Sequence, residues 1–136
     1  MSYLIDTCAI SELVRPRPNP KVRSWFRTAP QEGLYLSVLT LGEIRKGVAR
    51  LTEGNRYARI VDWLEHDLPA WFGSHILSVD TKVADEWGRL MAKAGRSLPA
   101  IDSLIAATAI HHRLTLVTRN TRDFAFAELD IINPWE

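Results

Sequence analysis

Short apolar runs along the chain alternate with longer stretches in which apolar residues recur every three or four positions. The runs predict strands over residues 3–5, 34–36, 76–79, 115–118 and 130–132. The recurring positions predict helices over residues 9–14, from 20 onward, and over 38–51, 56–68, 81–94 and 101–112. Strand–helix–strand alternation is typical of parallel sheets. We therefore expect a three-layer α/β fold with a parallel sheet of about five short strands flanked by helices.

Prolines and capping residues set the expected ends of these helices. Residues 15–20 hold three prolines, which remove amide donors and restrict their neighbours, so the first helix must end there. Ser37 and Asp80 are expected N-caps, and Gly95 is expected to close the helix that Asp80 begins. Pro69 is expected to stop the helix that precedes it.

The composition is that of an ordinary globular domain, with 46% hydrophobic and 24% charged residues. No apolar run approaches the ~20 residues of a membrane span, and the first residues lack the pattern of a signal peptide. Cys8 is the single cysteine and has no internal disulfide partner, which fits a reducing compartment. We expect one domain over residues 1–136, located in the cytoplasm and without membrane contact.

The charges are unevenly distributed, although the formal net charge is only +1. Residues 1–50 carry eight Lys or Arg against four Asp or Glu, and acids are in excess in the remainder. This mild basic bias is compatible with a polyanionic partner such as a nucleic acid. Arginines scattered over a solvated face produce the same pattern, so the bias alone decides nothing.

Four acids lie where the expected strands end or the following helices begin. Asp6 directly follows the first strand, and Asp123 comes shortly after the 115–118 strand. Glu43 lies about two turns into its helix, and Asp102 lies in the first turn of another. Ligands of open parallel sheets bind outside the carboxyl ends of the strands, so these acids can converge there. Taken singly, each also has a structural interpretation as a helix cap, an exposed helix-face acid, a helix-dipole partner or a turn residue.

A group of carboxylates at one edge of a sheet requires a compensating cation. Two carboxylates about 5 Å apart repel by about 3 kcal/mol at an effective dielectric of 20, and crowding raises their pKa values. Carboxylate oxygens, with Thr7, Thr118 and Asn120 as neutral neighbours, suit Mg²⁺ or Mn²⁺ better than zinc. The adjacent His111 and His112 cannot face one common site on a helix, so a zinc site is not expected.

Four ordered segments resemble the acidic motifs of PIN domains, and the resemblance runs essentially from end to end. The segments are Ile5-Asp6-Thr7, Leu41-Gly42-Glu43-Ile44-Arg45-Lys46-Gly47, Ile101-Asp102-Ser103-Leu104-Ile105-Ala106-Ala107 and Leu116-Val117-Thr118-Arg119-Asn120-Thr121-Arg122-Asp123-Phe124. The chain most resembles the VapC and FitB-like toxins of type II toxin–antitoxin modules. The resemblance implies a three-layer PIN-like fold and a single PIN domain over residues 1–136.

The resemblance also assigns roles to individual residues. The acids that it places in the catalytic and metal-binding site are Asp6, Glu43, Asp102 and Asp123. The supporting residues that it implies are Thr7, Thr118 and Asn120. Asp6 and Asp102 match the positions most directly involved in holding the metal. Many PIN domains carry an acid where this chain has Asn120, so three options stay open for Asp123: direct metal contact, contact through water, or none.

The implied activity is that of an endoribonuclease in which Mg²⁺ activates water for in-line attack on phosphorus. Glu43 or Asp123 would orient that water or help to hold a second ion. This route leaves a 5′-phosphate and a 3′-hydroxyl and does not use the 2′-hydroxyl as nucleophile. The basic residues that flank the motifs as candidate phosphate contacts are Arg45, Lys46, Arg119 and Arg122. Surface charge for solubility is an equal alternative for these four.

The resemblance further implies a cognate antitoxin that keeps the toxin inactive, and a homodimer that can enter a larger toxin–antitoxin assembly. The chain has more aromatic residues than its core requires, and we hypothesise that some form an antitoxin groove and a dimer face. The residues considered are Trp25, Phe26, Trp63, Trp71 and Phe72.

Other classes of protein fit the acids less well. A phosphotransferase of the haloacid-dehalogenase type needs an acid two residues after the first, where this chain has Cys8. A receiver domain needs a lysine after a late strand, where Arg119 is a poor substitute. The remaining alternative is a non-catalytic PIN-like module that binds RNA or protein, and the presence of all four acids favours the enzyme.

Overall fold

A computed structural model describes residues 1–51, 54–126 and 128–136. Within these residues five strands form one parallel sheet in the order β3-β2-β1-β4-β5. The strands are β1 (Tyr3–Ile5), β2 (Leu34–Ser37), β3 (Ile76–Leu77), β4 (Thr115–Val117) and β5 (Ile131–Ile132). The central position of β1 places the residue that follows it, Asp6, in the middle of one edge of the sheet. The predicted parallel sheet with β5 at its edge is confirmed.

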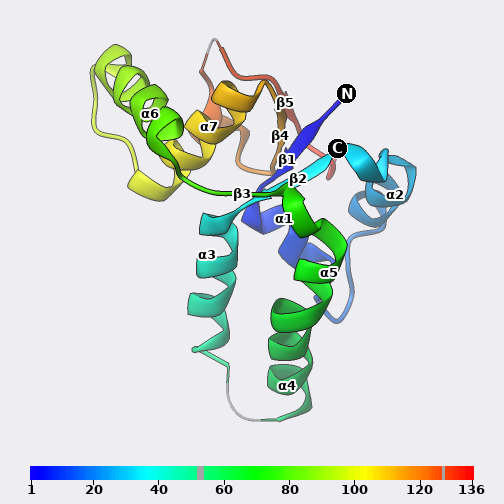
Figure 1. Cartoon of the computed structure of the whole chain (residues 1–136). Coiled ribbons are helices and arrows are strands. Elements are labelled where there is room, and N and C mark those ends of the chain that lie inside the picture. The colour runs from blue at the N-terminus through cyan, green and yellow to red at the C-terminus, as the bar shows by residue number, and fades with distance from the viewer. Residues whose placement is uncertain (52–53, 127) are drawn as a thin grey trace.

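Helices cover both faces of the sheet (Figure 1). The helices of the described residues are α1 (Thr7–Glu12), α2 (Pro20–Thr28), α3 (Val38–Val48), α4 (Asn55–Asp62), α5 (Leu68–Phe72), α6 (Thr81–Ala94) and α7 (Ala100–His112). Helices α6 and α7 pack together on one face, and α1 to α5 contribute to the core on the other. None of the described helices is long and apolar enough to cross a membrane.

Successive side chains of each strand point to opposite faces of the sheet, so the protein has one apolar core on each face. Leu4 and Leu116 point into the core beneath α6 and α7, whereas Ile5 and Val117 point into the core beneath the other helices. All four side chains are completely buried. Burial on both faces explains why the strands read as continuous apolar runs rather than as alternating ones, and it confirms the three-layer prediction.

The predicted caps are confirmed, but the helix over 56–68 does not stop at Pro69. Helix α4 passes into a π-helical turn, Trp63–Asp67, and then into α5, which contains the proline. The Leu68 amide donates to the carbonyl of Trp63, five residues back, because the turn is widened. Pro69 therefore stands in the first turn of α5, where a missing amide donor is tolerated.

Several predicted elements differ from the structure in their bounds. Helix α1 lies two residues earlier than the predicted 9–14, β4 and β5 are each one residue shorter than predicted, and α3 and β3 end early. Helix α3 ends at Val48, and the amides of Arg50 and Leu51 each donate three residues back in tight turns that follow it. Strand β3 is limited to two residues, because the chain leaves the sheet before Asp80 caps α6 through its bond from the Val83 amide, at 2.9 Å.

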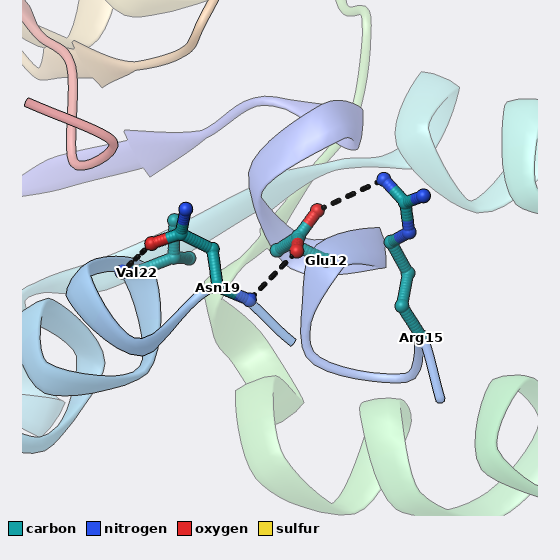
Figure 2. A network of polar contacts seen from close by, with 4 residues as sticks. All are labelled: Glu12, Arg15, Asn19 and Val22. Atoms are coloured by element: carbon teal, nitrogen blue, oxygen red, sulfur yellow. Dashed lines mark hydrogen bonds and ion pairs between the residues drawn. The ribbon is translucent and has the colours of Figure 1, made fainter. Parts of the chain in front are cut away.

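A buried carboxylate that the sequence did not single out joins α1 to α2 (Figure 2). Glu12, the last residue of α1, is only 5% exposed. Its carboxylate accepts a hydrogen bond from the Asn19 amide at 2.8 Å and a contact from the Arg15 guanidinium at 3.4 Å. The Asn19 side chain in turn caps α2 by accepting from the amides of Lys21 and Val22. This network fixes the proline-rich turn between the two helices.

Removal of the Glu12 carboxylate is expected to destabilise the fold. In Glu12→Ala the half-buried Asn19 amide loses its acceptor, and loss of the partner of a buried donor costs about 1–3 kcal/mol, so a value toward the lower end is expected. Glu12→Gln retains an acceptor oxygen of the same reach and is expected to lose less than half as much. Urea denaturation of both variants and wild type measures the difference. Equal midpoints for all three proteins would show that the network does not stabilise the fold.

Candidate active site

Asp6 lies at the centre of the site. Its amide continues the sheet by donating to the Val117 carbonyl at 2.9 Å, and its side chain caps α1 by accepting from the Thr7 amide, also at 2.9 Å. The second carboxylate oxygen accepts from the Thr118 hydroxyl at 2.7 Å. Asp6 is only 4% exposed, and burial raises its pKa although these hydrogen bonds favour the charged form. The capping role of Asp6 is therefore real, and it leaves a desolvated carboxylate at the edge of the sheet.

Thr7 links Asp6 to Glu43. The Thr7 hydroxyl donates to Glu43 Oε1 at 2.6 Å and lies 3.1 Å from the hydroxyl oxygen of Thr40. Because Glu43 and Thr40 both belong to α3, this contact fixes α3 against the start of α1. Glu43 is half-buried and is not the freely exposed helix-face acid of the alternative interpretation.

The segment after β4 forms the other wall of the site. Thr118 is fully buried, and its hydroxyl oxygen accepts from the Asn120 amide at 3.0 Å. The Asp123 amide donates to the Asn120 carbonyl at 3.1 Å, within a short 3-10 helix, Thr121–Phe124. Asn120 and Asp123 are themselves exposed. The Thr118 hydroxyl thus contacts Asp6 directly, whereas Asn120 is joined to this wall through its backbone amide and carbonyl.

Asp102 gives the clearest sign that the four acids share one space. It lies in the first turn of α7 and is half-buried. Burial raises its pKa, and the negative charges of Asp6, Glu43 and Asp123 raise it further. Carboxylates from three other parts of the chain therefore lie near enough to Asp102 to raise its pKa.

Cys8 also belongs to this site, a position that no motif in the sequence indicates. Its thiol lies 3.6 Å from both Asp6 Oδ2 and the Thr118 hydroxyl oxygen, and its sulfur accepts from the Arg119 amide at 3.5 Å. Burial, followed by the charge of Asp6, raises the pKa of the thiol. The protonated thiol is a weak donor to Asp6 and a poor metal ligand.

The donor chemistry of the acids fits a hard divalent cation. Four carboxylates with hydroxyl neighbours supply oxygen ligands of the kind that Mg²⁺ and Mn²⁺ prefer, and a cation between them would remove their mutual repulsion. Within residues 1–51, 54–126 and 128–136, no three His, Cys, Asp or Glu side chains stand in a finished metal-binding arrangement. Coordination would thus require side-chain adjustment, most easily by the exposed Asp123.

The candidate phosphate-contact residues differ in their surroundings. Arg45 pairs with Glu65 across 2.8 Å, so its charge is partly satisfied on the protein surface. Lys46 and Arg119 line hollows that include Thr7 and Glu43. Arg122 is exposed on the short helix that carries Asp123. Of these four residues, Lys46 and Arg119 therefore lie closest to the acidic site by the hollows that they line, which makes them the better candidates for phosphate contacts.

The aromatic residues considered for an antitoxin groove or a dimer face differ in their exposure. Phe26 and Phe72 are 6% and 4% exposed and belong to the core, so they are not available for a groove or a dimer face. Trp25 is half-buried and packs edge-on against the rings of Phe26 and Tyr3. Trp71 is exposed, and Trp63 lines a pocket beside Glu43.

Comparison with known proteins identifies the family. The PIN domain model matches residues 3–131. Toxin FitB of Neisseria gonorrhoeae is 38% identical over 135 residues, which cover 97% of each chain. The VapC ribonuclease Y4jK of Sinorhizobium fredii is 37% identical over 136 residues, which cover 98% of this chain and 97% of the relative.

Solved structures agree with this result. The crystal structure of FitAcB from Neisseria gonorrhoeae superposes with a TM-score of 0.90 at 38% identity, covering 98% of both chains. A toxin–antitoxin complex from Klebsiella pneumoniae matches with a TM-score of 0.71 at 26% identity, covering 99% of both chains. The chain belongs to the PIN-domain family. Within that family its similarity is to toxins of the FitB and VapC type, as the motifs predicted.

Proposed function

We propose that this protein is the ribonuclease toxin of a type II toxin–antitoxin module, and that its four convergent acids form the catalytic site. The observation that carries the proposal is the chain of hydrogen bonds by which Thr118 and Thr7 hold the carboxylates of Asp6 and Glu43 at the edge of the sheet. The pKa of Asp102, raised by burial and then by the charges of Asp6, Glu43 and Asp123, supports it. The toxin FitB and the VapC ribonucleases among the relatives support the same activity. PIN-domain ribonucleases generally depend on divalent metal ions, which agrees with the donor chemistry of the site.

Asp6 and Asp102 would hold the cation, for which we propose Mg²⁺ with Mn²⁺ as a substitute, and Glu43 and Asp123 would complete its surroundings. When bound, Mg²⁺ supplies positive charge to a phosphate oxygen and lowers the pKa of water. Asp6 is oriented for this role by its hydrogen bonds from the Thr7 amide and the Thr118 hydroxyl. Hydrogen-bonded partners of this kind fix the direction of a ligand.

Glu43 is the acid best placed to orient the attacking water. The Thr7 hydroxyl fixes one of its carboxylate oxygens at 2.6 Å, whereas Asp123 is exposed and its side chain is free to turn. In-line attack by water on phosphorus breaks the bond to the 3′ oxygen, and a proton returns to that oxygen. The products would be a 5′-phosphate and a 3′-hydroxyl.

A toxin of this type acts on RNA and is restrained by an antitoxin, so we propose both as partners. The toxin–antitoxin complex from Klebsiella pneumoniae supports the second assignment through its shared fold. We also propose that the toxin forms a homodimer. A cytoplasmic location accompanies this function, because a bacterial toxin meets both its RNA and its antitoxin there.

The decisive experiment is cleavage of end-labelled single-stranded RNA by purified protein free of antitoxin. Cleavage is expected with Mg²⁺, none with EDTA, and the fragments are expected to carry 5′-phosphate and 3′-hydroxyl ends. Asp102→Asn should abolish the activity. Asp85→Asn, an exposed acid paired with Arg89 on α6, is the matched control and should leave it unchanged.

Two outcomes would contradict the proposal. Equal cleavage by wild type and Asp102→Asn would identify a contaminating nuclease. A panel of RNAs that wild type binds but leaves intact with Mg²⁺ would favour the non-catalytic binding module instead.

A further inference from the structure

Beside the acidic site lies a pocket of about 380 Å³, here called the Trp63 pocket, between α1, α3 and α4. Thr7 and Glu43 are among its lining residues, so the pocket adjoins the acidic site. Its interior is apolar and includes Ile44, Ile60 and the half-buried ring of Trp63. This volume lies within the range of roughly 300–1,000 Å³ that is typical of small-molecule sites.

The lining of the Trp63 pocket combines aromatic rings with arginines. Arg15, Arg56 and Arg119 all line it. The Glu12 network holds Arg15, whereas Arg56 and Arg119 form no ion pair with any residue that the structure describes. The Arg119 guanidinium lies 5.4 Å from the ring centre of Trp135, which also lines the pocket. Aromatic faces beside arginines are the surfaces on which single-stranded nucleic acids stack their bases.

A second hollow, of about 540 Å³, lies against the neighbouring face of α3. It shares Thr7, Glu43 and Gly47 with the Trp63 pocket, and it carries two further cations, Lys46 and Arg50. Neither cation is paired with a described residue. Two cationic hollows thus meet at the acidic site, an arrangement complementary to a polyanion that crosses it with one nucleotide on each side.

We propose that the Trp63 pocket binds a nucleobase of the RNA adjacent to the cleaved phosphodiester, with Arg56 and Arg119 contacting the flanking phosphates. This inference rests on the proposed ribonuclease function and deepens it, because it makes the pocket a determinant of which RNA positions are cut. The apolar interior accepts the base, and the rim of arginines matches the backbone charge.

Gly47 provides a way to fill the space without disturbing the core. It lies inside α3 and lines both hollows, and a Cβ built there meets no atom within 4 Å. Gly47→Leu should fold, because leucine favours a helix more than glycine does. Gly88→Leu is the matched control: Gly88 lies in α6, and its Cβ position is equally free of neighbours.

The experiment uses an RNA oligonucleotide cleaved at one mapped bond, and versions in which each nucleotide near that bond is abasic. For wild type with Mg²⁺, loss of the base at one adjacent position is expected to lower kcat/KM about 10-fold or more. In Gly47→Leu the ratio between intact and abasic RNA is expected to fall toward one, because the base no longer has its pocket. Gly88→Leu should behave as wild type.

Three outcomes would overturn the inference. Wild type that cleaves RNA with no sensitivity to any abasic position would refute the base pocket alone, and the proposed function would stand. An unchanged ratio in Gly47→Leu, together with weaker binding of the purified antitoxin, would assign the pocket to the protein partner. Wild type that cleaves no RNA with Mg²⁺ would overturn the proposed function and the inference with it.

Discussion

An Asp6→Asn variant is expected to lose at least about 100-fold of its RNA cleavage while it keeps its fold. Asparagine preserves the shape of the side chain and an oxygen that can accept from the Thr7 amide, but it removes the negative charge. Residues that hold a divalent ion at a phosphate support several kcal/mol of transition-state stabilisation, and each ~1.4 kcal/mol is a tenfold change in rate. Among the described residues the other buried acid is Glu12, and its carboxylate is already bonded to the Asn19 amide. It is therefore not available to replace Asp6.

Single-turnover cleavage of the mapped oligonucleotide with saturating Mg²⁺ measures this loss, and circular dichroism verifies the fold. Asp62→Asn, on the exposed surface of α4 next to His66, controls for removal of a carboxylate elsewhere. If Asp6→Asn retained more than a tenth of the wild-type rate, Asp6 would be a helix cap rather than part of the catalytic site.

The positions of the acids could be predicted because they depend on few physical rules. A parallel sheet places the carboxyl ends of its strands at one edge, and a strand buried on both faces reads as an apolar run. The residues that follow β1 and β4, Asp6 and Thr118, are therefore predicted to lie together, and the Thr118 hydroxyl does contact the Asp6 carboxylate. The position of Asp102 could be predicted from the start of its helix alone, because Pro99 marks that start.

Side-chain contacts between distant segments could not be predicted in the same way. Glu12 reads as one more helix acid, and only the path of the proline-rich turn brings the Asn19 amide to it. Arg15 and Arg56 lie far from the acidic motifs in sequence but line the Trp63 pocket. The π-helical turn before Pro69 leads into Leu68 and Phe72, which pack in the core, and no local sequence pattern predicts it.

The repulsion between the acids has a further consequence for stability. Metal-free protein holds Asp6 and Asp102 in surroundings that disfavour their charged forms, mainly because of burial. The site is thus arranged for binding at the expense of stability, as is common at functional sites. A cation that binds only the folded protein should recover what the unpaired charges lose.

The contributions of Asp6 and Asp102 to the stability of metal-free protein are therefore expected to fall as the pH rises from acid toward neutral. When folding raises the pKa of a carboxyl group, the group contributes to stability fully below its unfolded pKa, about 3.9. This contribution is lost as the pH rises through the folded pKa. Asp6 and Asp102 act in this direction. Partial burial lowers the pKa of His112, and backbone hydrogen bonds lower the pKa values of Asp80 and Glu128. Their contributions are present above the unfolded pKa, are lost as the pH falls through the folded pKa, and oppose those of Asp6 and Asp102. The difference in stability between wild type and Asp102→Asn at each pH removes the contributions of these opposing groups, because both proteins share them.

Thermal unfolding between about pH 4 and 8, with EDTA or Mg²⁺, tests the prediction. With EDTA near neutral pH, Asp102→Asn is expected to melt above wild type, and the gap should close toward low pH. Mg²⁺ at about 100 times its Kd should stabilise wild type by about 2.7 kcal/mol and the variant by much less. Equal stabilisation of both proteins by Mg²⁺ would exclude Asp102 as a ligand. A difference in melting temperature that stays constant across the pH range with EDTA would instead show that folding does not raise the pKa of Asp102.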